Sequence, residues 1–82
     1  MTDDTDILIK NICKLHTTQM GVERIRRNLV LPDENVVEWC RARILDQGAV
    51  FHQQGKNWYI KVDGYVITVN KSSYTIITAH KQ

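Results

Sequence analysis

The sequence is poor in cysteine and proline and has no long apolar stretch. Its 82 residues contain two cysteines, one proline and four glycines. Small secreted domains usually carry several disulfides, so two cysteines argue against a disulfide framework and are typical of reduced thiols. No apolar run approaches the ~20 residues that cross a bilayer, and the acidic start MTDDTD is the reverse of a signal peptide's basic start. We therefore expect a cytoplasmic protein that does not enter a membrane.

Length and charge leave room for one domain and for an anionic partner. A chain of this length makes a single domain, which we expect to span residues 1–82. With 43% hydrophobic and 24% charged residues, the composition is that of an ordinary globular protein. The formal net charge of +2 permits a partner such as RNA or another anionic polymer but does not require one.

The first half of the chain has the periodicity of helices. Apolar residues recur on one helical face in residues 5–15, from residue 17 or 18 to residue 29, and in residues 33–46. Pro32 suits the first turn of the third helix, with Asp33 or Glu34 at its positive end, and Gly48 is placed to end it. The helical part should therefore cover about residues 4–47.

The second half of the chain has the period of β-strands. From Ala49 the apolar residues recur at every second position, which predicts four short antiparallel strands over about residues 49–80. Asp63-Gly64 is the sequence of a two-residue hairpin turn. A turn there pairs Ile60 with Ile67, so the turn and the hydrophobic pattern agree on one buried face.

The orientation of the fourth strand depends on the length of the loop that precedes it. A three-residue loop at residues 71–73 makes Ile67 face Ile77, and one step of register would move every side chain to the other face. We prefer this loop because it gives the core Thr75, Ile77 and Ala79. The side chains that it places on the opposite face are Tyr74, Ile76, Thr78 and His80, together with Tyr59, Lys61 and Thr68.

These patterns predict an α+β fold, in which three N-terminal helices pack on one face of a C-terminal antiparallel four-stranded β-meander. Trp39 lies off the clearest helical stripe, so we expect it to be partly exposed and to mark a subunit contact. The predicted core consists of Leu8, Ile12, Leu15, Ile25, Leu29, Val37, Cys40, Ile44, Trp58, Ile60, Ile67, Val69 and Ile77.

Several segments of the chain resemble those of a known protein family. KLHTT, GVERIRRNL, VVEWC, GKNWYI and ITVNKSSYTIITAHK together resemble the small bacterial domain-of-unknown-function family 3781. The resemblance covers nearly the whole chain and implies no activity. The order of helices and meander, with a late T-x-x-T-A-H strand, is more loosely similar to the barnase and RelE-like ribonuclease toxins. That likeness implies RNA cleavage without a metal ion.

The residues that bind metals are few and scattered. Cys13 and His16 could share a helix face, but Cys40, His52 and His80 would have to join them from distant segments. The sequence contains neither C-x-x-C nor H-x-x-x-H, and no phosphate-binding loop of the common types. We expect no metal and no cofactor, with both cysteines as buried structural thiols.

Basic and aromatic residues suggest contact with nucleic acid. The candidate binding residues are Arg24, Arg26 and Arg27 of RIRRN, with Lys56, Tyr59 and Lys61 from the strands. The arginines could equally form a solvated helix face, with Glu23 compensating their charge. If the protein cleaves RNA, His80 and His16 would share the proton transfers, Arg24 or Lys56 would neutralise charge, and Tyr74 and Thr78 would position the phosphate.

Two classes of function remain open from the sequence. In one, the protein binds RNA, or is a metal-independent endoribonuclease of the toxin type. In the other, it is a non-catalytic protein–protein interaction module, a homodimer that uses Trp39 or a sheet edge. The sequence leaves open whether the protein is an enzyme.

Overall fold

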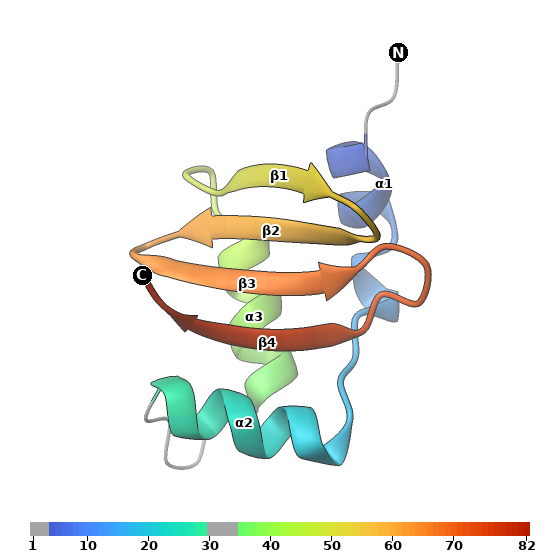
Figure 1. Cartoon of the computed structure of the whole chain (residues 1–82). Helices are drawn as coiled ribbons and strands as arrows, with labels where there is room; N and C mark the ends of the chain where they lie inside the picture. Colours follow the sequence, from blue (N-terminus) through green and yellow to red (C-terminus); the bar gives the residue numbers. More distant parts are fainter. Residues whose placement is uncertain (1–3, 30–34) are drawn as a thin grey trace.

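The computed structural model describes residues 4–29 and 35–82, with the helices first and the strands second (Figure 1). The predicted α+β fold is confirmed. Its elements are α1 (Asp4–Lys10), a 3-10 helix η1 (Ile12–Lys14), α2 (Gln19–Leu29), α3 (Val36–Ile44), β1 (Val50–Gln54), β2 (Asn57–Val62), β3 (Tyr65–Asn70) and β4 (Ile76–Lys81).

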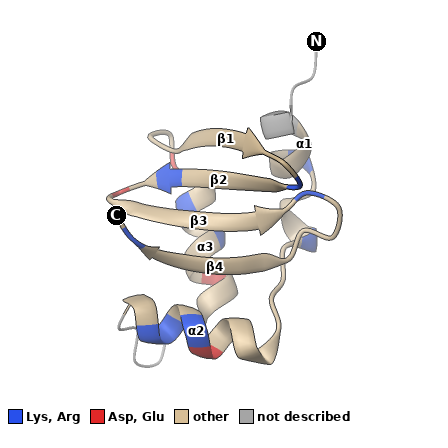
Figure 2. Cartoon of the chain, in the orientation of Figure 1, with Lys and Arg blue, Asp and Glu red and all other residues tan. Residues whose placement is uncertain are grey.

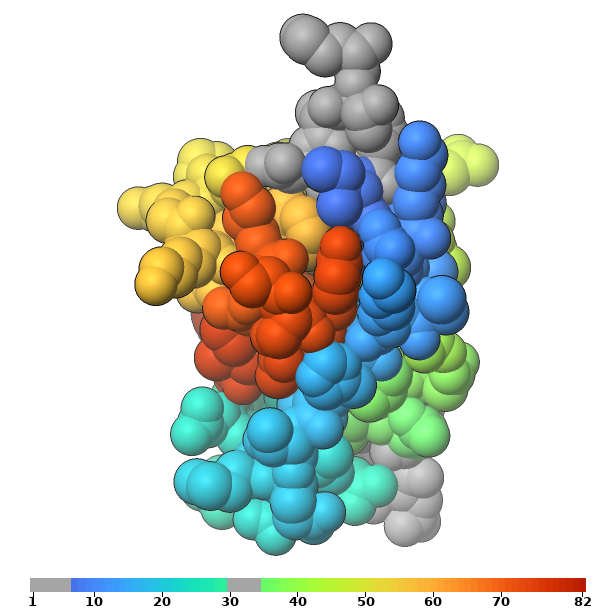
Figure 3. All heavy atoms as spheres, turned by 90° about the vertical axis from the view of Figure 1, so that its right-hand side faces the viewer, coloured from blue at the N-terminus to red at the C-terminus, as the bar shows by residue number. Residues whose placement is uncertain are grey.

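The molecule has two layers. The strands form one antiparallel sheet in the order β1-β2-β3-β4. In Figure 1, α1 and α3 lie behind this sheet and α2 runs beside β4, while no described helix crosses the front of the sheet. Figure 3, turned by 90°, shows the strands on one side and the blue and green helical residues on the other. None of the described helices therefore covers the other face of the sheet.

Capping side chains explain where α2 and α3 begin. Thr18 caps α2, because its hydroxyl accepts a hydrogen bond from the backbone N–H of Gly21 at 3.0 Å. Asn35 does the same for α3, accepting from Glu38 N at 3.1 Å. The predicted start of the third helix at Pro32, Asp33 and Glu34 lies outside the described residues.

The first helix is shorter than the predicted residues 5–15. α1 ends at Lys10, and the chain then forms the single 3-10 turn η1. Leu15 is extended, with φ −60° and ψ 131°, yet its side chain is buried. Ile12 and Leu15 therefore contact the core from a turn and from an extended residue rather than from one continuous helix.

Two tight turns fix the pairing of the first three strands. Asp63 and Gly64 have φ of 52° and 80°, as a type I′ hairpin turn requires. The predicted pair Ile60↔Ile67 is confirmed, and Trp58 pairs with Val69 in the same register. Gly55, with φ 62°, makes the corresponding turn between β1 and β2.

The loop before β4 is longer than predicted, and the predicted register is wrong along the whole strand, because Ile67 pairs with Ala79 rather than with Ile77. The N–H of Asn70 donates to the carbonyl of Thr75 at 2.9 Å, so four residues (71–74) form the loop. Val69 then pairs with Ile76, whereas the next pair along β3 is Thr68↔Thr78. Ile77 is left over between these two pairs as a β-bulge.

The bulge splits the fourth strand into a part whose side chains lie on the opposite face from the predicted one and a part whose faces agree with the prediction. The second part keeps its predicted faces because its register is shifted by two residues, which preserves the alternation. Ile76, expected to be exposed, is buried with 1% exposure, while Ile77, expected in the core, is only half-buried. Thr75, also expected in the core, is half-buried and hydrogen-bonded to other side chains. Beyond the bulge the alternation recovers, so Ala79 is buried and His80 is exposed, as predicted.

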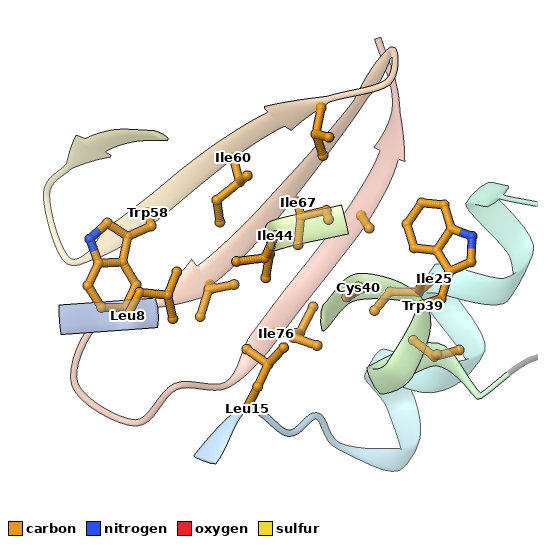
Figure 4. Close-up of a cluster of buried hydrophobic side chains, with 14 of the residues drawn as sticks. Leu8, Leu15, Ile25, Trp39, Cys40, Ile44, Trp58, Ile60, Ile67 and Ile76 are labelled. Atoms are coloured by element: carbon orange, nitrogen blue, oxygen red, sulfur yellow. The ribbon is translucent and has the colours of Figure 1, made fainter. Parts of the chain in front are cut away.

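The core lies between the sheet and the helices (Figure 4). Most predicted core residues are buried, although Ile12, Val37 and Ile77 are only partly so. Trp39 contradicts the prediction of partial exposure: it is 8% exposed, and its ring meets that of Tyr65 edge-on at 5.0 Å. The buried hydrophobic residues are Leu8, Leu15, Ile25, Leu29, Val36, Trp39, Cys40, Ile44, Trp58, Ile60, Val62, Ile67, Val69, Ile76 and Ala79.

The two cysteines differ. Cys40 is buried, as predicted, whereas Cys13 is exposed, which corrects the expectation of two buried thiols. In the described parts of the chain, no helix is long and apolar enough to cross a membrane.

Candidate nucleic-acid interface

The sheet face opposite the helices, here called the outer face, presents side chains in rows that run across the strands. The register places His52, Tyr59, Thr68 and Thr78 in one row. The next row toward the Asp63-Gly64 turn contains Val50, Lys61, Val66 and His80. Neighbouring side chains within a row are about 5 Å apart, so a flexible ligand could touch several of them at once.

The strands carry no carboxylate. None of the residues in β1, β2, β3 or β4 is Asp or Glu. Figure 2 shows the acidic residues of the described chain in turns and on helices, while Lys61 and Lys81 lie at strand ends. An anionic ligand on the outer face would therefore meet cations and neutral groups only.

A shallow groove of ≈ 470 Å³ crosses the outer face over β1, β2 and β3. The aromatic ring of Tyr59, which is half-buried, lies in its lining beside the exposed imidazole of His52 and the ammonium group of Lys61. Val50, which is 61% exposed, supplies an apolar rim. The groove thus combines an aromatic surface, a titratable ring and one cation.

A hydrogen-bonded cluster lies where the chain enters β4. His16 Nδ1 is 2.8 Å from the carbonyl oxygen of Lys14, and Nε2 is 3.0 Å from the hydroxyl of Thr75. Because a carbonyl can only accept, Nδ1 is the protonated nitrogen of the neutral ring, and Nε2 accepts from Thr75. The hydroxyl of Ser73 is 2.7 Å from that of Thr75. His16 is thus a potential base. The Lys14 carbonyl fixes the orientation of its ring, and its other nitrogen is hydrogen-bonded to the hydroxyl of Thr75.

The backbone holds this cluster in place. His16 and Thr75 form an isolated parallel bridge, in which His16 N donates to the carbonyl of Tyr74 and Ile76 N donates to the carbonyl of His16 at 2.7 Å. In Figure 3 the blue residues of this segment lie directly against the orange β3–β4 loop. Thr75 also lines a ≈ 270 Å³ hollow between α2 and β4, which Arg24 lines as well.

The predicted catalytic residues do not meet at one point. His16 lies next to the start of β4 and His80 near its end, five residues beyond Thr75. At ~3.3 Å per residue that separation is about 16 Å, too far for both imidazoles to touch one phosphate. Thr78 is on the outer face, opposite Thr68. Sequence reasoning missed Thr75 and Ser73, although the hydroxyl-rich run SSYT is a visible signal.

Tyr74 is not on the outer face, which corrects the predicted orientation. Its ring packs against the core and lies 6.0 Å from that of Trp58. The ammonium nitrogen of Lys14 lies 5.8 Å from the centre of the ring. Tyr74 has φ 58°, a conformation that costs about 1–3 kcal/mol in a residue other than glycine. The packing of the ring compensates this strain.

The basic residues predicted to contact nucleic acid lie in separate places. Arg24, Arg26 and Arg27 are on α2, where Arg24 and Arg27 line a ≈ 140 Å³ hollow with Glu23. Asn28 connects this helix to β4, donating to Thr78 Oγ1 and to the carbonyl of Ala79, both at 3.3 Å. Lys61 is on the outer face, and Lys56 is in the β1–β2 turn.

The thiols and carboxylates are not arranged as a metal site. Among the described residues, no three His, Cys, Asp or Glu side chains are close enough together to hold an ion. Burial raises the pKa of the Cys40 thiol to about 12, and nearby Arg43 opposes this shift. Cys40 is therefore protonated at neutral pH.

Fold and surface together define a two-layer α+β protein whose antiparallel sheet has one open, carboxylate-free face. The chain belongs to the family described as "Protein of unknown function (DUF3781)", which matches residues 9–80. The resemblance to this family is thus confirmed. No curated protein and no solved structure matches the chain, so the looser likeness to ribonuclease toxins has no support from relatives.

Proposed function

We propose that the protein binds single-stranded RNA across the outer face of its sheet. The observation that carries the proposal is the composition of this face, which has aromatic and imidazole rings, hydroxyls and Lys61 but no carboxylate. The groove around Tyr59 provides a surface against which a base can lie. Open antiparallel sheets with exposed rings are a common platform for unpaired bases.

Each kind of side chain has a task in this proposal. Tyr59 stacks on a base, which is worth about 1–3 kcal/mol. Lys61, one step along the same strand face, pairs with a phosphate, so that binding weakens as salt is added. The half-buried Thr78 lies in the same row as Tyr59, and its hydroxyl can bond a ribose hydroxyl, whereas Thr68 between them is buried.

Fluorescence anisotropy of a labelled oligouridine at low salt tests this proposal. Tyr59→Ala should weaken binding about 5- to 150-fold, the equivalent of one lost stacking contact. Lys61→Gln should also weaken binding and make it less dependent on salt. The matched control is Lys10→Gln, which removes the same charge from an exposed position at the end of α1. Equal losses in Lys61→Gln and Lys10→Gln would mean that net charge, not the outer face, attracts the RNA.

The His16–Thr75 pair favours a second candidate function, RNA cleavage without a metal ion. In this reaction a ribose 2′-hydroxyl replaces the Thr75 hydroxyl at Nε2 of His16 and gives its proton to that nitrogen. The 2′-oxygen then bonds to phosphorus, the bond from phosphorus to the 5′-oxygen breaks, and that oxygen takes a proton from water. The hydroxide so formed takes the proton held by His16, which restores the neutral imidazole. The products are a 2′,3′-cyclic phosphate and a 5′-hydroxyl, while Arg24 neutralises charge on the phosphate.

Cleavage is tested with the same oligonucleotide in the presence of a chelator. His16→Gln should abolish formation of the cyclic phosphate but weaken binding in the anisotropy titration much less than Tyr59→Ala does, since His16 is outside the groove. Lys10→Gln should cleave like the wild type. If the wild type binds RNA without cleaving it, the cleavage proposal is wrong and the binding proposal stands.

A further inference from the structure

One edge of the sheet is open. At the opposite edge, α2 packs along β4, and His16 forms a bridge to Thr75 just before β4. β1 pairs with β2 only, and no other described strand lies beyond it. The backbone groups of β1 that point away from β2 therefore have no strand partner within the described chain.

This edge lacks the charged side chains, the proline and the bulge that often keep sheet edges apart. Natural proteins protect such edges with charged side chains, proline or a bulge. β1 reads VFHQQ, with no Lys, Arg, Asp, Glu or Pro. Its pairing with β2 is regular from Val50↔Lys61 to Gln54↔Asn57. Four of its five side chains are exposed, and Val50 is 61% exposed.

The hairpin geometry identifies the backbone groups that are available. A two-residue turn closes on a hydrogen-bonded pair, which here is Gln54↔Asn57. Alternation along the ladder then directs the backbone groups of His52 toward β2 and those of Phe51 and Gln53 away from it. Phe51 and Gln53 each offer one N–H and one carbonyl to a new strand.

We propose that two copies of this chain pair through β1 in antiparallel register, with His52 on the two-fold axis. Phe51 then pairs with Gln53 of the partner subunit, and Gln53 with the partner's Phe51, which gives about four backbone hydrogen bonds. His52 faces the partner's His52 as a pair without backbone hydrogen bonds.

A second copy fits this edge because the strand is self-complementary. In the proposed register Val50 faces Gln54 of the partner subunit, and no two like permanent charges oppose each other. The two-fold axis is perpendicular to the sheet. Both outer faces therefore point in the same direction, and the two grooves lie side by side. The contact between two short strands is smaller than the ~1,200 Å² of stable interfaces, so dimerisation should depend on protein concentration.

Disulfide formation tests the register directly. His52→Cys, made in a Cys13→Ser background, places two thiols across the axis. The α-carbons of such a pair are about 4.5 Å apart, within the range of a disulfide. Mild oxidation should give a covalent dimer in most of the protein. Gln54→Cys is the matched control, because its two copies lie about 13 Å apart in this register and should stay monomeric under the same oxidation.

Sedimentation velocity over a range of concentrations provides the second measurement. The wild type should form dimers at high concentration. Gln53→Pro, which removes an outward N–H without touching the β1–β2 ladder, should raise the dimer dissociation constant at least tenfold, while Gln53→Thr should not. A wild type that stays monomeric to millimolar concentration, or a cross-link at position 54 rather than 52, would overturn the proposal. If a strand of another protein pairs with β1 instead, the isolated wild type would stay monomeric in the same way. RNA binding by a monomer would still stand.

Discussion

At the scale of single residues, an aromatic ring and a guanidinium group cover the ring of Trp39. Trp39 lies off the apolar stripe of α3 but is covered by Tyr65 from β3 and by the guanidinium of Arg43, 4.8 Å from the centre of its ring. These contacts come from other turns and from another element. Helical periodicity predicts the side of the helix on which a residue lies, but it does not predict a distant ring that packs over it.

The buried thiol of Cys40 leads to a prediction about alkaline pH. Its pKa is about 12, against an ordinary value of 9.0, because burial disfavours the thiolate. Above pH 9 the unfolded chain loses this proton while the folded chain keeps it. The free energy of unfolding should therefore fall as the pH rises from about 9 toward 12.

Denaturant unfolding between pH 8 and 11 measures this effect in the wild type and in Cys40→Ala. The variant should be less stable at neutral pH, because it leaves a cavity. Its stability should fall less steeply above pH 9, however, because the titrating group is absent. Parallel pH profiles for the two proteins would show that Cys40 does not contribute.

At the scale of the elements, turn sequences and alternation predict most of the sheet. The Asp63-Gly64 turn sets the pairing of β2 with β3, and both agree with the hydrophobic pattern. The loop before β4 has no such signal, because Tyr74 adopts φ 58° where glycine or asparagine would be expected. The bulge at Ile77 leaves no mark in a sequence that reads IIT, so the register of Ile76 could not be predicted.

The bulge predicts that two neighbouring isoleucines contribute unequally to stability. Ile76 is 1% exposed and belongs to the core, whereas Ile77 is half-buried and unpaired. Ile76→Ala should lower the free energy of unfolding by about 2–5 kcal/mol. Ile77→Ala should cost distinctly less. Urea denaturation of the two variants compares them directly, and a larger loss for Ile77→Ala would refute the register.

At the scale of the whole molecule, the fold brings the candidate residues to two places rather than one. The outer face collects Tyr59, Lys61 and His80, as the alternation along the strands predicts. His16 instead joins Thr75 through a parallel bridge between segments 59 residues apart. Periodicity along the chain carries no information about such a contact, so the candidate site could be predicted on the sheet but not where the chain enters β4.

Amide chemical-shift mapping shows residue by residue whether single-stranded RNA binds to the outer face. Unlabelled oligouridine is added to isotope-labelled protein at low salt, and the shifts are followed across the whole chain. Binding at the outer face should give progressive changes along β1–β4, largest around His52, Tyr59 and Lys61, that reverse as salt is added. No change at millimolar RNA, or changes confined to α1, would contradict it.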